Sequence, residues 1–193
     1  MQFCYFIPSR ILFGPGELSR LHEQAMPGKK ALIVISAGKS MRANGYLERV
    51  QKELELAGVS SVVFDKILPN PIRKHVMEGA ALAKAEGCDF IVGLGGGSSI
   101  DSAKSIAVMA TNPGDYWDYI SGGSGKEMPV KNPPLPIVAI TTTAGTGTEA
   151  DPFTVITKED TQEKIGFGVD GTFPVLSVVD PELMLSVPAH LTA

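Results

Sequence analysis

The sequence predicts an α/β fold with a mostly parallel sheet flanked by helices, and two observations lead to this prediction. Short continuous runs of apolar, often β-branched residues alternate with longer stretches in which apolar residues recur every three or four positions. Alternation of buried strands with amphipathic helices is typical of βαβ units, whose strands run parallel. Glycine and proline, at 21 and 14 of 193 residues, supply the turns between these elements.

The individual elements follow from these two periodicities. Strands are predicted at the continuous apolar runs, residues 31–36, 61–65, 89–94, 135–140 and 175–180. Helices are predicted where apolar residues recur at helical spacing, residues 47–57, 72–83 and 100–110. The opening segment 3–13 is expected to form a short N-terminal hairpin or edge pair, and residues 112–134 a loop. We expect residues 1–193 to form a single domain.

Charge and composition exclude several classes of function. The formal net charge is −4 and the basic residues are scattered, so no basic stripe is present for a nucleic acid backbone. The apolar runs are too short to span a membrane, and we expect no membrane partner. Only two cysteines, Cys4 and Cys88, are present, which predicts no disulfide framework and favours a reducing, cytoplasmic compartment.

The glycine-rich segment GLGGGSSID, residues 93–101, is the strongest local signal. It follows a predicted strand and opens a predicted helix, where Ser98 or Ser99 could cap the helix. Consecutive glycines let the backbone approach a ligand, and the free N–H groups of a helix N-terminus favour a phosphate. The usual dinucleotide fingerprint has a glycine where Ser98 stands and follows the first strand, so a purely structural turn is the alternative.

A second polar loop, ITTTAGTGTEAD at residues 140–151, also follows a predicted strand directly. Its threonine hydroxyls and backbone N–H groups suit a polar ligand, although such loops are often merely solvated. Ligands of open α/β sheets bind beyond the carboxyl ends of the strands, where both loops should lie. The two loops together therefore predict a phosphate-containing ligand at that edge of the sheet.

Motifs for nucleophilic or metal chemistry are not supported. The Gly38-Lys39-Ser40 segment has Ile33 where a P-loop needs its first glycine, and no G-x-S-x-G is present. The three histidines are far apart in sequence, at His22, His75 and His190. We therefore expect neither catalytic residues nor metal ligands within this chain.

With both loops identified, the sequence resembles the N-terminal half of the iron-containing alcohol dehydrogenase family along its whole length. The motifs that carry the resemblance are FIPSRILFGPGEL at the start, ALIVIS at 31–36, PNP at 69–71, GGGSSIDSAK at 95–104, TTTAGTGTEADPFTVIT at 141–157 and VVDPELMLSVPAHLTA at 178–193. The resemblance implies a Rossmann-like domain that binds a nicotinamide dinucleotide. It is stronger than the resemblance to the related glycerol dehydrogenase and dehydroquinate synthase group. A free-standing nucleotide-binding module is the alternative outside enzymology.

The resemblance also implies site residues. Those at pyrophosphate positions are Gly96, Gly97 and Ser98, and those on the pyrophosphate and nicotinamide side are Thr142, Thr143 and Thr146. Further nucleotide-pocket positions are Asn70, Phe153, Lys164 and Leu183, and Asp101 matches the acidic residue at the head of the glycine-loop helix.

One position bears on the choice between NAD and NADP. Many family members have an aspartate at the end of the first long strand, which binds the adenosine ribose hydroxyls, and this chain has Ser36 there. A serine does not repel a 2′-phosphate, and the nearby Lys39 could pair with one. Ser36 and Lys39 are thus candidate cofactor residues, and NADP is favoured at least as much as NAD.

The family's metal ligands match no position in this chain. In the family, a divalent metal, Fe²⁺ or another, is held by a following all-helical domain that this sequence does not contain, and it favours the alkoxide of a small alcohol or aldehyde substrate. We therefore expect the 193 residues alone to bind a dinucleotide and to be inactive. The full-length enzyme is expected to be a homo-oligomer.

Overall fold

A computed structural model describes residues 2–3 and 6–189 of the chain. The strands are β1 (Arg10–Phe13), β2 (Lys30–Ser36), β3 (Ser60–Ile67), β4 (Phe90–Gly95), β5 (Ile137–Thr141), β6 (Thr154–Lys158), β7 (Glu163–Phe167) and β8 (Leu176–Val179). The α-helices are α1 (Ser40–Ala43), α2 (Tyr46–Leu56), α3 (Arg73–Glu86) and α4 (Gly97–Thr111). Short 3₁₀ helices are η1 (Glu17–Glu23), η2 (Tyr116–Tyr119), η3 (Asp170–Thr172) and η4 (Pro181–Met184).

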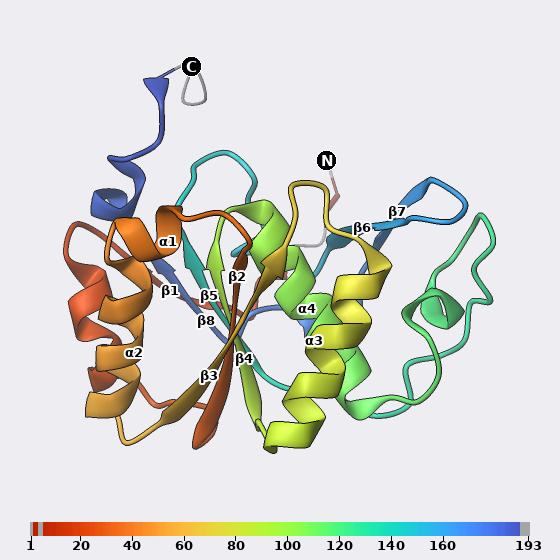
Figure 1. The fold of residues 1–193 in the computed structure, drawn as a ribbon, viewed down its shortest axis with the longest axis horizontal. Helices are drawn as coiled ribbons and strands as arrows, with labels where there is room; N and C mark the ends of the chain where they lie inside the picture. Colours follow the sequence, from red (N-terminus) through yellow and green to blue (C-terminus); the bar gives the residue numbers. More distant parts are fainter. Residues whose placement is uncertain (1, 4–5, 190–193) are drawn as a thin grey trace.

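The main sheet has six strands in the order β1-β8-β5-β4-β2-β3, and every neighbouring pair is parallel. Strands β6 and β7 form a separate antiparallel pair that lies beside the upper ends of α3 and α4 (Figure 1). The parallel sheet confirms the predicted α/β, Rossmann-like class. It also brings the carboxyl ends of all its strands to one edge, at the top of Figure 1.

Two helical layers cover the two faces of this sheet (Figure 1). Helices α1 and α2 with η1 cover one face, and α3 and α4 cover the other. Along β2 the side chains alternate, so that Ile33 and Ile35 join the first core and Leu32 and Val34 the second. Burial on both faces explains why β2 and β4 are continuously apolar.

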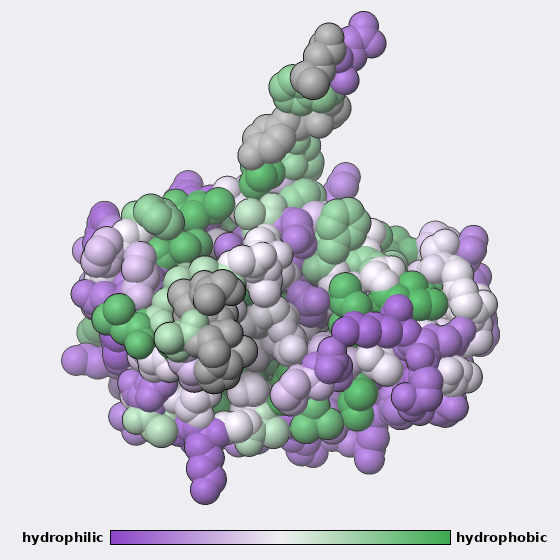
Figure 2. Space-filling model, turned by 90° about the horizontal axis from the view of Figure 1, so that it is seen from above, coloured by the Kyte–Doolittle hydropathy of each residue, from purple (hydrophilic) through white to green (hydrophobic). Residues whose placement is uncertain are grey.

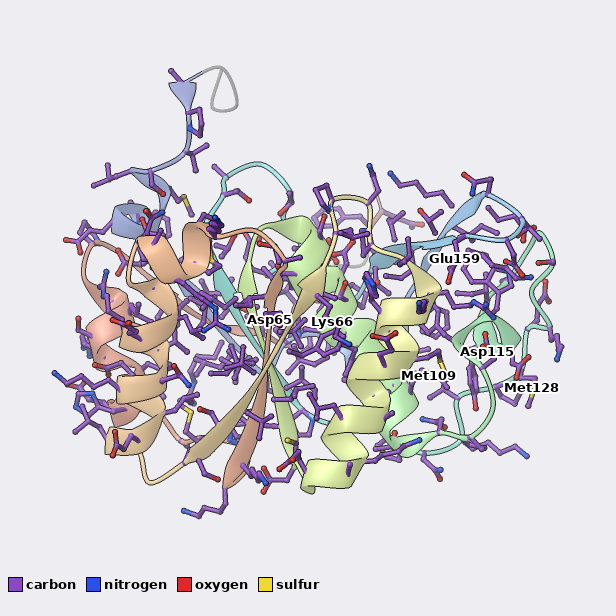
Figure 3. The ribbon with its side chains drawn as sticks, in the orientation of Figure 1. Asp65, Lys66, Met109, Asp115, Met128 and Glu159 are labelled. Atoms are coloured by element: carbon purple, nitrogen blue, oxygen red, sulfur yellow. The ribbon has the colours of Figure 1, made fainter. Side chains whose placement is uncertain are left out.

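The excursion after α4 is held by ion pairs as well as by the buried aromatic side chains of η2. Arg73, the first residue of α3, lies 3.0 Å from Asp115 in the excursion and 4.0 Å from Glu159 in the β6–β7 turn. Asp115 and Glu159 come from these two separate segments at the right of Figure 3. The excursion therefore packs against the rest of the described chain, which agrees with its prediction as an internal loop.

No helix in the described part of the chain is long and apolar enough to cross a membrane.

Two local predictions were wrong or incomplete. The N-terminal hairpin is absent from the described residues, because β1 pairs in parallel with β8, more than 160 residues later in the chain; residues 4–5 of that segment lie outside the described part. The β6–β7 hairpin was not predicted, because its two five-residue strands are short and their few apolar residues stand among Thr, Lys, Glu and Gly. A strand's own pattern cannot identify its partner, which explains the first error.

Strand β4 and helix α4 approach each other closely at Gly93. A Cβ built there would lie 3.0 Å from the Cβ of Ala103 and 3.0 Å from the Cα of Ile100. The second neighbour is backbone, so relief would require the helix to move. This position has the same role as the glycine that allows close helix–strand packing in dinucleotide folds.

We predict that Gly93→Ala lowers the free energy of unfolding by about 1–3 kcal/mol, the usual cost of overpacking a core. Urea denaturation followed by circular dichroism measures it. Gly166→Ala is the matched control, since a Cβ at that exposed strand position meets nothing closer than 4.0 Å. The control should be neutral or slightly stabilising, and equal losses in the two variants would contradict the packing argument.

Candidate functional site

The candidate site lies where the direction of chain progression across the sheet reverses. Strand β2 lies between β3 and β4 in the sheet. The chain passes from β2 into α1 and α2 on one face of the sheet, and from β4 into α4 on the opposite face. The loops after these two strands therefore diverge at the carboxyl edge of the sheet (Figure 1). Such a switch point is where open α/β sheets bind ligands.

The glycine turn between β4 and α4 is packed directly against the threonine loop. Gly95 has φ 142°, a backbone conformation that residues with a side chain rarely adopt. Its carbonyl accepts a hydrogen bond from the backbone N–H of Thr142 at 3.0 Å. A Cβ on Gly96 would lie 2.9 Å from the Oγ1 of Thr143. A Cβ on Gly97 would lie 3.2 Å from the Cγ2 of Thr146. These glycines allow the two loops to touch.

Helix α4 begins at Gly97, and its N-cap is Gly96. The prediction that Ser98 or Ser99 caps the helix is wrong, because both serines lie inside its first turn and no side chain in the described structure caps it. The first turn also contains no acidic residue. The uncapped N–H groups and the positive end of the helix dipole are thus available to an anion.

A pocket of ≈ 350 Å³ opens beside this helix terminus. It is lined by Asn70, Pro71, Gly97, Ser98, Asp101, Thr146, Thr148, Asp151, Phe153, Val155 and Lys164. Lys164 reaches it from β7, and its Nζ donates to the Oδ1 of Asn70 at 2.8 Å. Asn70 has φ 55°, in the left-handed region. A flexible cation and the helix N-terminus therefore line the same pocket, an arrangement suited to a phosphate group.

One wall of this pocket is held by a buried lysine. Lys104 of α4 is completely buried, and its Nζ donates to the Oγ1 of Thr148 (2.8 Å), the Oδ1 of Asp151 (3.0 Å) and the carbonyl of Phe153 (2.8 Å). Asp101, three residues earlier on the same helix, accepts from Thr148 Oγ1 at 2.7 Å and from the N–H of Val155 at 3.0 Å. Helix α4 is thereby joined to the segment that carries Phe153.

Burial shifts both ionisable groups of α4 toward their neutral forms. Desolvation raises the pKa of Asp101, opposed by the hydrogen bonds from Thr148 and Val155 and by the charge of Lys104. Desolvation lowers the pKa of Lys104, opposed by its hydrogen bond and ion pair with Asp151. Asp101, predicted to be a cofactor residue, therefore lines the pocket while both of its oxygens are occupied by bonds within the protein.

A second pocket, of ≈ 500 Å³, lies at the carboxyl ends of β2 and β3. Its lining residues are Ser36, Ala37, Gly38, Lys39, Arg42, Ala43 and Asp65. Asp65 stands beside Lys66 on β3 (Figure 3) and accepts from the Nη2 of Arg42 at 2.8 Å. The structure thus brings the two predicted cofactor-choice residues, Ser36 and Lys39, to one pocket together with an ion pair that sequence reasoning did not identify.

The predicted site residues fall into three groups. Those around the first pocket are Asn70, Gly97, Ser98, Asp101, Thr146, Phe153 and Lys164, with Gly96, Thr142 and Thr143 in the loop contact beneath it. Ser36 and Lys39 line the second pocket. Leu183 is apart from both, because its side chain is fully buried in the core that α2 covers. Lys104 was missed, although its spacing of three from Asp101 places both on one helical face.

Residues 2–3 and 6–189 contain no group of three or more His, Cys, Asp or Glu side chains placed to hold a metal ion. His22 instead pairs with Glu53 at 2.6 Å, which joins η1 to α2. His190 lies outside the described residues.

We predict that Lys104→Met lowers the free energy of unfolding by about 3–5 kcal/mol at neutral pH, because it removes the three hydrogen bonds of the buried ammonium and leaves the desolvated carboxylate of Asp101 without a nearby positive charge. Loss of the cation raises the pKa of Asp101 further above its ordinary 3.8. The folded variant then binds a proton more readily than the unfolded chain, so its deficit relative to the parent should narrow as the pH falls from 7 toward 4. Urea titrations at several pH values measure this, with the exposed Lys52→Met as control. A pH-independent deficit would contradict the role of Asp101.

The chain matches one protein family along most of its length. The family model for iron-containing alcohol dehydrogenase matches residues 8–181. The 1,3-propanediol dehydrogenase of Klebsiella pneumoniae is 38% identical over 100% of this chain and 49% of its own length. An archaeal alcohol dehydrogenase from a Red Sea brine pool superposes with a TM-score of 0.92 at 38% identity, over 99% of this chain and 49% of its own.

A sulfoacetaldehyde reductase from Bifidobacterium kashiwanohense, solved in complex with NAD⁺, superposes with a TM-score of 0.85 at 32% identity, over 99% of this chain and 49% of its own. The chain thus spans about half the length of the relatives it matches. The family model covers most of the 193 residues. This chain therefore belongs to the iron-containing alcohol dehydrogenase family.

Proposed function

We propose that residues 1–193 form the dinucleotide-binding domain of a metal-dependent alcohol dehydrogenase or aldehyde reductase. The observation that carries the proposal is the uncapped N-terminus of α4, which opens into a polar pocket at the switch point of a parallel sheet. A relative named as a 1,3-propanediol dehydrogenase, one named as an alcohol dehydrogenase and a sulfoacetaldehyde reductase solved with NAD⁺ support it.

The pocket residues fit a dinucleotide pyrophosphate. The N–H groups of the first turn of α4 and the hydroxyl of Ser98 would donate hydrogen bonds to it, and Lys164 of the same pocket would pair with its negative charge. When bound, the nicotinamide supplies hydride transfer. The buried bonds of Lys104 hold the segment with Phe153 in place, so that this wall keeps its position and limits access of water.

We further propose that the divalent metal of the enzyme is bound by residues outside this chain. The described residues offer no suitable set of side-chain donors for a divalent metal. Apolar side chains such as Phe153 and Leu185 are exposed, at 61% and 83%. Hydrophobic patches are interspersed with hydrophilic ones on the face at the carboxyl ends of the strands (Figure 2). A further domain that covers this face fits such a surface. We also propose that the full-length enzyme is cytoplasmic and forms a homo-oligomer.

We predict that isothermal titration of the chain shows binding of a nicotinamide dinucleotide and that Lys164→Met weakens it about 10- to 100-fold, because a charge-assisted bond to phosphate is lost. Lys164 is exposed, so the variant should fold. The control is Lys131→Met, an exposed lysine outside this pocket.

Gly97→Val should abolish binding, since its side chain would displace Thr146 and deform the helix terminus. Undiminished affinity in both Lys164→Met and Gly97→Val would remove this pocket from the site.

We also predict that the isolated chain oxidises no alcohol, whichever divalent metal is supplied. A cation that lowers the pKa of a bound alcohol needs about three or four fixed ligands. The measurement is alcohol-dependent reduction of NAD or NADP followed at the nicotinamide absorbance band. Activity that a chelator abolishes and iron or zinc restores would contradict the proposal and would require a complete metal site within these residues.

A further inference from the structure

The pocket at the ends of β2 and β3 carries an unbalanced set of charges. Lys39 and Arg42 lie on its rim with a single carboxylate, that of Asp65. The Nη2 of Arg42 lies 2.8 Å from the Oδ2 of Asp65, whereas Lys39 makes no ion pair with any residue that the structure describes. The pocket therefore has a net positive lining.

This pocket is one strand removed from the terminus of α4. Strand β2 lies between β4, which leads into α4, and β3, which carries Asp65. A dinucleotide whose pyrophosphate lies at the N-terminus of α4 therefore extends its adenosine half over the end of β2. The ribose of that half reaches Ser36 and the charged residues around it. The inference below rests in this respect on the proposed function.

We infer that the Arg42–Asp65 ion pair sets the choice between NADP and NAD. Arg42, assisted by Lys39, pairs with the 2′-phosphate of NADP. Asp65 opposes that phosphate and reduces the preference. Residue 36 only leaves room for the phosphate, because the serine hydroxyl carries no charge.

The exposure of the pair is what makes this exchange feasible. The side chains of Arg42 and Asp65 are 55% and 50% exposed, so their mutual attraction is screened by water and is weak. A phosphate dianion offers the planar guanidinium two parallel hydrogen bonds and more charge than one carboxylate. Arg42 can therefore turn from Asp65 to the phosphate at small cost. Its position on α1, directly after the β2 loop, keeps it within the same pocket.

The test is the ratio of NADP⁺ to NAD⁺ affinity, measured by isothermal titration of the chain. Arg42→Met should lower the ratio about 10- to 100-fold, through the loss of charge-assisted bonds to the phosphate. Its affinity for NAD⁺ should remain within about twofold of the parent, since a surface ion pair contributes little. The unchanged NAD⁺ affinity also shows that the variant is folded.

Asp65→Asn should raise the ratio about three- to tenfold, because a negative charge near the phosphate is removed while the shape is kept. The gain should disappear in the double variant with Arg42→Met if the two residues act as one unit. Lys52→Met on α2, exposed and outside the pocket, is the matched control and should leave the ratio unchanged.

The outcomes separate this inference from the proposed function. A parent chain that binds NAD⁺, with a ratio that neither Arg42→Met nor Asp65→Asn changes, overturns the inference and leaves the dinucleotide site intact. A parent chain that binds neither NAD⁺ nor NADP⁺ overturns both. A ratio that falls with Arg42→Met and rises with Asp65→Asn supports the inference, and the preference for NADP⁺ should then weaken as salt is added.

Discussion

The close approach of β4 to α4 is the constraint on which the rest of the domain depends. Gly93 lets the helix lie against its own strand, and the positive φ of Gly95 turns the chain sharply enough for α4 to start at once. The helix terminus consequently opens at the edge of the sheet, where its N–H groups remain uncapped. A side chain on Gly93 would separate strand from helix and would shift the terminus away from the threonine loop.

The charged residues around the candidate site fall into a buried group and an exposed group. Deep in the domain, Lys104 and Asp101 are desolvated and bonded to the 148–155 segment, so their charges stabilise one geometry of the pocket wall. Near the surface, Lys164 and Arg42 are exposed and hold only weak partners, Asn70 and Asp65. Buried charge thus provides rigidity, and exposed charge remains free to bind an incoming phosphate.

Much of the fold could be predicted because its central strands are buried on both faces. Continuous apolar runs identified β2, β4 and β5, and recurring apolar residues identified α2, α3 and α4. The β6–β7 hairpin escaped, since its strands are short and largely polar, and β1 was given the wrong partner. Local patterns report burial, whereas pairing between distant strands depends on the packing of the whole sheet.

The amino-acid sequence alone was sufficient to predict the parallel α/β class, the two polar loops and the position of these loops at the carboxyl ends of strands. These features depend on the periodicity of apolar residues and on the backbone freedom of glycine. Tertiary structure alone decided which residues share a pocket. Asn70 and Lys164 are 94 positions apart and yet hydrogen-bonded, and Arg42 meets Asp65 because β2 and β3 are adjacent. The tertiary structure also decided that the side chains of Leu183 and Lys104 are buried. Contacts between distant segments follow from sheet order and helix packing, which no local pattern encodes.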